Sequence, residues 1–211
     1  MSEDDPRTRA ASRLRELNHE FIARDLSDDD LKVIEARARE LLALARQSGR
    51  RRRVAEDAVF DEFRTATLEE GKPAHYLSDS FVTGDNSPVS LGAHFWREGE
   101  QIVMEATFGP AFEGAPSMGH GGVLTALIDE AMGLAVAMQR VLAFTARLDV
   151  NFRSPVPLHQ PVTVRAWLER RDGRKFSVAA VVLDGETVLS EATGLFISVD
   201  PEKFVEKLTA G

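Results

Sequence analysis

Two adjacent acidic residues interrupt an otherwise apolar segment near the middle of the chain. Val123–Met138 reads VLTALIDEAMGLAVAM, and Asp129 and Glu130 are its only charged residues. Apolar residues on nearly every side predict a helix that is buried over most of its surface. A carboxylate there is costly unless it is paired, hydrogen-bonded or protonated. One interpretation is a structural acid with a satisfied partner. The other is a general base or nucleophile whose pKa is tuned by burial.

Asp129 and Glu130 point about 100° apart around such a helix, so they cannot face the same neighbour. We expect one of them at an edge, near solvent or a basic partner, and the other held against a cleft. The sequence alone does not assign which acid takes which place.

A histidine between glycines directly precedes the apolar segment. The run Gly119-His120-Gly121-Gly122 would form a helix N-terminus, where backbone N–H groups lack partners and the helix dipole is positive. Glycine also lets a ligand approach the backbone closely. Donors of this kind suit a carbonyl oxygen that gains negative charge in a transition state. The plainer interpretation is a glycine turn that only starts the helix.

The distance between these two features predicts how they could be used together. Gly121 and Asp129 are eight residues apart, which is about 12 Å along one helix. One reacting carbonyl cannot touch both. The simplest source of the second group is the same helix in a second subunit, related by a two-fold axis. We therefore expect a homo-oligomer with shared sites, either a dimer or a dimer of dimers.

The elements around this helix have the patterns of strands. Alternating apolar residues in Leu91–Phe95 and Ile102–Phe108, with Arg97–Glu100 between them, predict a hairpin. A Gly/Pro-rich loop, Gly109–Gly119, leads to a helix over Gly121–Met138. Asp172-Gly173 and Asp184-Gly185 are hairpin-turn pairs. They help to divide the rest into four more strands, expected at Phe144–Phe152, Val162–Glu169, Lys175–Leu183 and Thr187–Val199. One mostly antiparallel sheet would then have to wrap around one central helix.

The first part of the chain differs in composition. Residues 1–65 are rich in Arg, Glu, Ala and Leu, without strand-like alternation. Ser27 followed by three aspartates is a helix start, and Gly49 is a helix stop. We predict a helical extension over residues 1–65, packed on the main domain or on a partner subunit, and a main domain over 76–202. The run Arg50–Arg53 is typical of a solvated helix end, although it could dock an acidic partner.

Charge and composition limit the classes of function. The net charge is −8, so neither nucleic acid nor an anionic membrane is expected as a partner. There are no cysteines, which excludes a thiolate nucleophile and fits a cytoplasmic protein. The N-terminus lacks the apolar core of a signal peptide, and no apolar run is long enough to span a membrane. The five histidines form no HxH or HExxH spacing, so no metal site is expected.

Several motifs in a fixed order resemble a known family. HGGVLTALIDEAMG, followed by TARLDVNFRSPVPL, GRKFSV and SEATGLFI, resembles the hotdog-fold acyl-CoA thioesterases, in particular the PaaI-like branch and the mitochondrial thioesterase-superfamily members. The match covers about Gly109–Pro201. It implies an α+β hotdog fold, and a hydrolase that cleaves acyl-CoA to free acid and CoA. It implies no cofactor, since CoA is part of the substrate.

The resemblance also implies roles for individual residues. Asp129 would activate water or act as nucleophile, Gly121 would donate its N–H to the thioester oxygen, and His120 would flank that turn. Thr145 would help to hold the water. The residues that would line the coenzyme A groove, with basic groups for its phosphates, are Asn151, Arg153, Arg174 and Lys175. Gly114 departs from the pattern, because some relatives place an Asn or Gln six residues before the motif histidine.

Three alternatives stay open beside thioester hydrolysis. The same groove could bind an acyl-CoA or an acyl-carrier protein without turnover. The N-terminal helices and Arg50–Arg53 could make the chain a pure interaction protein. A dehydratase on the same fold is less favoured, because it needs an acid–histidine pair, and His120 lies about 13 Å from Asp129 along the helix.

Overall fold

The computed structural model describes residues 5–51, 68–74, 77–201 and 203–204. Two helices come first, α1 (Pro6–Ala23) and α2 (Asp28–Gln47). The main domain runs through β1 (His94–Glu98), β2 (Gln101–Thr107), the short 3-10 helix η1 (Pro110–Phe112), α4 (Gly121–Ala137), β3 (Ala143–Phe152), β4 (Pro161–Asp172), β5 (Lys175–Asp184) and β6 (Thr187–Ser198). The predicted order of strand, strand, helix and four strands is confirmed.

The six strands form one antiparallel sheet in the order β1-β2-β4-β5-β6-β3. In both predicted hairpin turns, Asp172-Gly173 and Asp184-Gly185, the glycine lies in the turn itself. Gly173 and Gly185 both have φ of 56°, a conformation that other residues rarely adopt. β3 is an edge strand that pairs only with β6. Most of its residues are exposed in the single chain.

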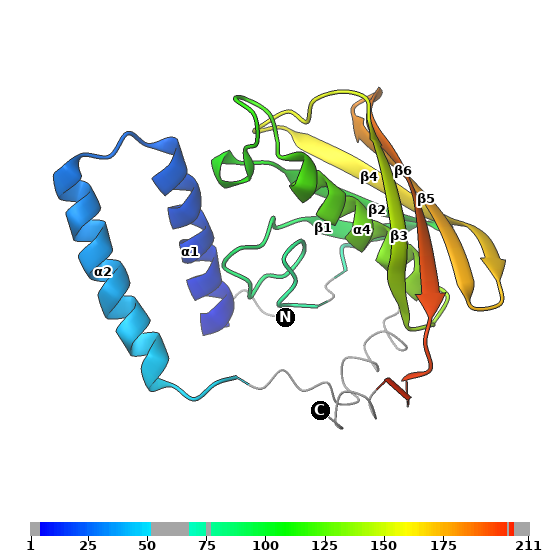
Figure 1. Cartoon of the computed structure of the whole chain (residues 1–211), viewed down its shortest axis with the longest axis horizontal. Helices are drawn as coiled ribbons and strands as arrows, with labels where there is room; N and C mark the ends of the chain where they lie inside the picture. The colour runs from blue at the N-terminus through cyan, green and yellow to red at the C-terminus, as the bar shows by residue number, and fades with distance from the viewer. Residues whose placement is uncertain (1–4, 52–67, 75–76, 202, 205–211) are drawn as a thin grey trace.

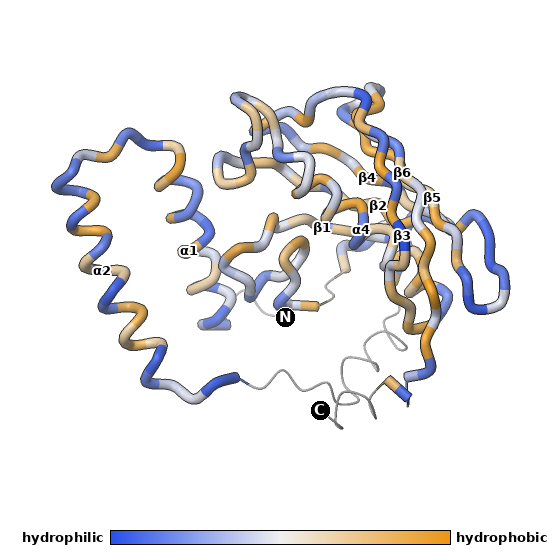
Figure 2. The backbone as a smooth tube through the Cα atoms, viewed as in Figure 1, coloured by the Kyte–Doolittle hydropathy of each residue, from blue (hydrophilic) through white to orange (hydrophobic). Residues whose placement is uncertain are grey.

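Helix α4 lies across one face of the sheet and fills the core (Figure 1). Figure 2 shows apolar residues along α4 and along the strands behind it. Gly194 of β6 lets the helix approach closely, because a Cβ there would lie 2.9 Å from the sulfur of Met132. The buried helix residues cover almost every side of α4: Leu124, Leu127, Ile128, Ala131, Met132, Leu134, Ala135 and Val136. The expected α+β hotdog architecture, with one helix held by an antiparallel sheet, is therefore confirmed.

The first predicted strand is displaced along the sequence. We expected it at Leu91–Phe95, but β1 covers His94–Glu98, and the turn narrows to Glu98–Gln101 around Gly99. Leu91 and Ala93 are buried as predicted, yet they belong to a loop. Their N–H groups bond to the carbonyls of Phe81 and Val82 instead of a neighbouring strand. The apolar alternation correctly predicted that these residues are buried, but it wrongly predicted that their backbone bonds to a neighbouring strand.

The N-terminal helices form an arm. Ser27 caps α2, as predicted, by accepting a hydrogen bond from the N–H of Asp30, and the helix ends at Gln47. α1 packs on the main domain beside η1, and α2 lies on its far side (Figure 1). α2 has no buried residue. Arg51, just after it, pairs with Asp79 at 2.8 Å.

The predicted boundaries at 65 and 76 fall at residues outside the described ranges, so the division of the chain at those points stays a prediction. Arg52 and Arg53 of the basic run also lie outside the described residues. Among the helices that the structure describes, none combines the length and apolar character needed to cross a membrane.

Candidate active site

The N-terminus of α4 leaves one backbone donor without a partner. His120 is the N-cap, and its Nδ1 accepts the N–H of Gly122 at 2.9 Å. The N–H groups of Val123 and Leu124 bond to the carbonyl of His120. Within the described part of the chain, the N–H of Gly121 has no acceptor. The first turn therefore presents a single unpaired N–H at the residue that the resemblance implies.

A groove of about 640 Å³ opens in front of this helix tip. Two segments line it. The first is Glu113–Gly121, except Pro116 and Ser117, and the second is Phe152–Val156, which begins with the last residue of β3. The ring of Phe152 lies against Gly121, where a Cβ would sit 3.5 Å from it. The groove therefore reaches from the unpaired N–H to Arg153.

Asp129 faces the edge strand. Its Oδ1 accepts a hydrogen bond of 2.8 Å from the hydroxyl of Thr145 on β3. A β-bulge between Thr145 and Arg147 shifts the register against β6. Beyond it, Leu148 and Val150 pack against the core, so strict alternation would turn Thr145 away from α4. The bulge brings it back to the helix-facing side.

Glu130 faces the loop before β1. Its carboxylate accepts hydrogen bonds from the hydroxyls of Ser80, at 2.6 Å, and Thr83. Burial raises the pKa of Glu130, and the nearby charge of Asp129 adds to the rise. The hydrogen bonds from the two hydroxyls lower the pKa, but burial is the larger effect. Glu130 therefore ties the loop before β1 to α4. We expected one acid at an edge and the other held against a cleft; the structure turns Asp129 toward the edge strand β3 and Glu130 toward the loop before β1.

The four residues expected to bind coenzyme A do not gather in one chain. Asn151 and Arg153 lie at the end of β3 near Gly121, and Arg153 forms an ion pair with Glu191 at 2.9 Å. Arg174 and Lys175 lie at the β4–β5 turn, where Arg174 donates to the carbonyl of Ser198. The two pairs are about 25 Å apart, by the number of β6 residues between their levels.

The eight residues therefore divide into two sets. Set G surrounds the helix tip: His120, Gly121, Asn151 and Arg153. Set D lies at the level of the edge acid: Asp129, Thr145, and Arg174 and Lys175, which are on the other side of β6 from Thr145. The catalytic and the basic candidates are therefore separated in the same direction along β6.

Gly114 packs directly against the helix tip. A Cβ on it would lie 2.9 Å from the Cα of His120, and its N–H bonds to the carbonyl of Met118. The loop as folded has no room for the Asn or Gln that some relatives place here. The sequence patterns did not identify Ser80 and Thr83 either. These residues lie in a segment for which no helix or strand was predicted, and only their hydroxyl groups could have indicated a role.

Part of the main domain is similar to proteins of a known family. Residues 118–191 match the model of the Thioesterase superfamily. Acyl-coenzyme A thioesterase THEM4 of Bos taurus is 41% identical over 97 residues, which are 45% of this chain and 40% of that protein. THEM4 of Mus musculus is 38% identical over 93 residues, 43% of this chain and 40% of that protein. The chain thus spans about two fifths of the length of these relatives.

Solved structures share the fold. A crystal structure of a thioesterase superfamily protein has a TM-score of 0.77 at 20% identity, over 92% of this chain and 91% of that one. The Escherichia coli PaaI protein has a TM-score of 0.50 at 17% identity, over 52% of this chain and 81% of that one. The resemblance seen in the sequence is confirmed over residues 118–191, and the domain built around α4 has the hotdog fold of these structures.

Proposed function

We propose that this protein hydrolyses acyl-CoA thioesters in sites shared between two subunits. The observation that carries the proposal is the division of the candidate residues into set G, at the start of α4, and set D, at the level of Asp129 in the middle of α4. On this proposal, the described part of one chain holds two half-sites that only a second subunit completes. The names of the THEM4 relatives, acyl-coenzyme A thioesterase, supply the substrate class.

The edge strand supplies a way to join the halves. If β3 pairs antiparallel with β3 of a second copy across a two-fold axis, its Phe152 end meets the other strand's Ala143 end. Gly121, which contacts Phe152, then comes near Asp129 of the partner subunit. Phe144 and Phe152, 44% and 54% exposed in the single chain, would be covered. The same operation brings Arg153 toward Arg174 and Lys175 of the partner subunit, where three cationic groups suit phosphates.

The geometry supports a direct mechanism. The unpaired N–H of Gly121 donates to the thioester oxygen, which becomes negative as the carbonyl carbon turns tetrahedral. Asp129 takes a proton from water, whose oxygen attacks that carbon. The C–S bond then breaks, and the CoA sulfur leaves with a proton. Alternatively, Asp129 attacks first and water hydrolyses the resulting anhydride. Thr145 holds Oδ1 in either case, which leaves Oδ2 for the reaction.

Release of thiol from a panel of acyl-CoA substrates tests the activity. The chain has no cysteine, so every thiol detected comes from CoA. We expect Asp129→Asn to lower kcat by at least a hundredfold. Asp149→Asn is the control, because Asp149 is a half-exposed carboxylate of β3 that pairs with Arg147 and belongs to neither set. Equal rates for wild type and Asp129→Asn would end the assigned role. Tight binding without turnover would favour a non-catalytic acyl-CoA binding module.

A hybrid dimer tests whether the site is shared. One subunit carries Asp129→Asn, the other carries Gly121→Pro, and the two carry different affinity tags. In a shared arrangement, one of the two sites draws an intact Gly121 and an intact Asp129 from opposite subunits. The purified hybrid should then recover about half of the wild-type rate, although both parent homodimers are inactive. If each site were built within one subunit, the hybrid would be as inactive as its parents.

A further inference from the structure

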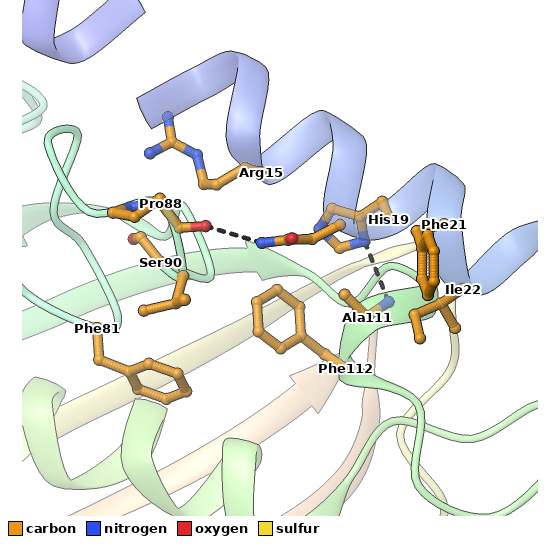
Figure 3. A pocket seen from close by; sticks show the side chains of 11 residues that line it. Arg15, His19, Phe21, Ile22, Phe81, Pro88, Ser90, Ala111 and Phe112 are labelled. Atoms are coloured by element: carbon orange, nitrogen blue, oxygen red, sulfur yellow. Dashed lines mark hydrogen bonds between the residues drawn. The ribbon is translucent and has the colours of Figure 1, made fainter. Parts of the chain in front are cut away.

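A second cavity lies between the arm and the main domain. Its volume is about 310 Å³, at the lower end for small-ligand pockets. α1 forms one wall, and the loop before β1 together with η1 forms the other (Figure 3). The side chains that give it an apolar interior are Phe21, Ile22, Phe81, Pro88, Val89 and Phe112. None of the residues proposed above for hydrolysis lines it.

Polar contacts hold the arm in place around this cavity. Arg15 donates to the carbonyls of Asp85 and Ser87, at 3.0 and 2.7 Å. Asn18 donates to the carbonyl of Pro88, and His19 accepts the N–H of Ala111 through Nδ1 at 3.2 Å. Figure 3 shows the last two bonds on either side of the cavity. The arm is thus fastened to the main domain by directed hydrogen bonds on both sides of the cavity.

Those apolar side chains stay open to solvent. Phe21 and Ile22 are 44% and 59% exposed, and Phe81 and Val89 across from them are 43% and 53% exposed. Covering such surface with an apolar ligand is favourable in proportion to the area that leaves water. The cavity offers no charged group other than Arg15, which is already bound to two carbonyls. Its chemistry therefore fits a hydrocarbon chain better than a polar ligand.

The cavity adjoins the helix tip through one residue. The carbonyl of Phe112 accepts the N–H of His120 at 2.8 Å, so the backbone of η1 is bound to the start of α4. The ring of Phe112 points to the other side, where it meets Phe81 and His19 edge-on. Glu113, the next residue, already lines the groove in front of Gly121. Phe112 and Glu113 are thus neighbouring residues of which one lines the cavity and the other lines the groove.

We propose that this cavity binds the far end of the substrate's acyl chain, and that α1 thereby sets the preference for chain length. This inference rests on the proposed hydrolysis, since it uses the position of the thioester at Gly121. Long aliphatic acyl groups would reach past Phe112 and be covered by α1. Short ones would end in the groove and make no contact with the arm.

Filling the cavity tests the proposal. Val89→Trp and Ile22→Trp each place a larger side chain in it, one from each wall, and both positions are exposed enough to leave the fold intact. Each methylene that is no longer buried weakens binding about fourfold. We expect both variants to lose at least tenfold in kcat/KM for palmitoyl-CoA and less than twofold for hexanoyl-CoA. Val33→Trp on α2 is the control, because Val33 is 60% exposed and lies outside the cavity.

Binding is measured separately from turnover with hexadecyl-CoA and hexyl-CoA, thioethers that cannot be hydrolysed. The wild type should bind the hexadecyl thioether more tightly, and both cavity variants should lose that difference. If the wild type hydrolyses nothing but shows this pattern, the hydrolysis proposal fails and the chain pocket stands. If both cavity variants keep the wild-type ratio between long and short chains, the chain pocket is refuted. It is refuted as well if the variants alter only the oligomeric state.

Discussion

Replacing Gly121 by proline should remove the oxyanion donor and leave the fold almost unchanged. Proline lacks only the N–H, and here that N–H has no partner among the described residues, so no hydrogen bond is lost. Gly121 is the first residue of α4, the position at which helices accept proline best. His120 before it has φ −70° and ψ 124°, the extended conformation that proline requires of its predecessor. The added Cβ would stand 3.5 Å from Phe152, an ordinary contact.

The expected magnitude follows from the role of the donor. Loss of one oxyanion-hole N–H typically costs about 3–4 kcal/mol, or a factor of roughly 10²–10³ in kcat. Stability should change by no more than about 1 kcal/mol, since the backbone already has the conformation that proline imposes. Gly121→Ala is the matched control, because alanine adds the same Cβ and keeps the N–H.

The assay is thiol release over a range of acyl-CoA concentrations, with unfolding in urea measured on the same preparations. Gly121→Pro should lose kcat, while Gly121→Ala should stay within about fivefold of wild type. Equal rates for Gly121→Pro and Gly121→Ala would refute the reasoning, whether both variants are active or both are inactive. If both are active, the N–H is not a donor. If both are inactive, the loss comes from the added carbon and not from the missing hydrogen.

Three further variants separate the parts of the site. Thr145→Val should lower kcat by about 10–100-fold without unfolding the domain, because it removes a hydrogen bond to a carboxylate, and Thr145→Ser should restore the rate. Glu130→Gln should keep kcat. Burial raises the pKa of Glu130 above its ordinary value of 4.5, so the wild type loses stability as the pH rises from 4.5 through the raised pKa and the carboxyl becomes charged. Glu130→Gln carries no such charge. Urea unfolding should therefore show the variant becoming more stable relative to wild type over that pH range, with no difference below pH 4.5. Gly114→Asn should lower activity instead of improving substrate orientation, because its Cβ would displace His120; a rate at or above wild type would mean that the loop has another conformation available.

Pattern and turn chemistry were enough to predict the main domain. The long apolar segment predicted a buried helix, and the last three of the four strands after it are joined by two turns whose glycines have positive φ. These signals are local, and they place α4 within one residue of its observed end. The loop before β1 was misassigned because burial alternates in it without a strand partner. Periodicity indicates which residues are covered, and it does not indicate what their backbones bond to.

The site was less predictable where its geometry depends on long-range contacts. Strict alternation on β3 would have turned Thr145 away from Asp129, and the bulge that corrects this has no mark in the sequence. The choice between Asp129 and Glu130 depends on two loop hydroxyls about fifty residues away. The cavity under α1 depends on an arm fastened by side chains to backbone carbonyls, and composition does not reveal such bonds.

The sequence led us to expect a second subunit, and the observed sheet indicates how that subunit could approach. Helix rise alone required a second copy of α4, but it did not say how that copy should approach. The structure adds that β3 is an edge strand, with Gly121 near its Phe152 end and Asp129 bonded to Thr145 near its Ala143 end. An antiparallel pairing of that edge with itself would reverse the order of the ends and so complete two sites at once. Any parallel approach would place like halves together, with two helix tips at one end and two acids at the other, and hydrolysis would then lack either donor or base.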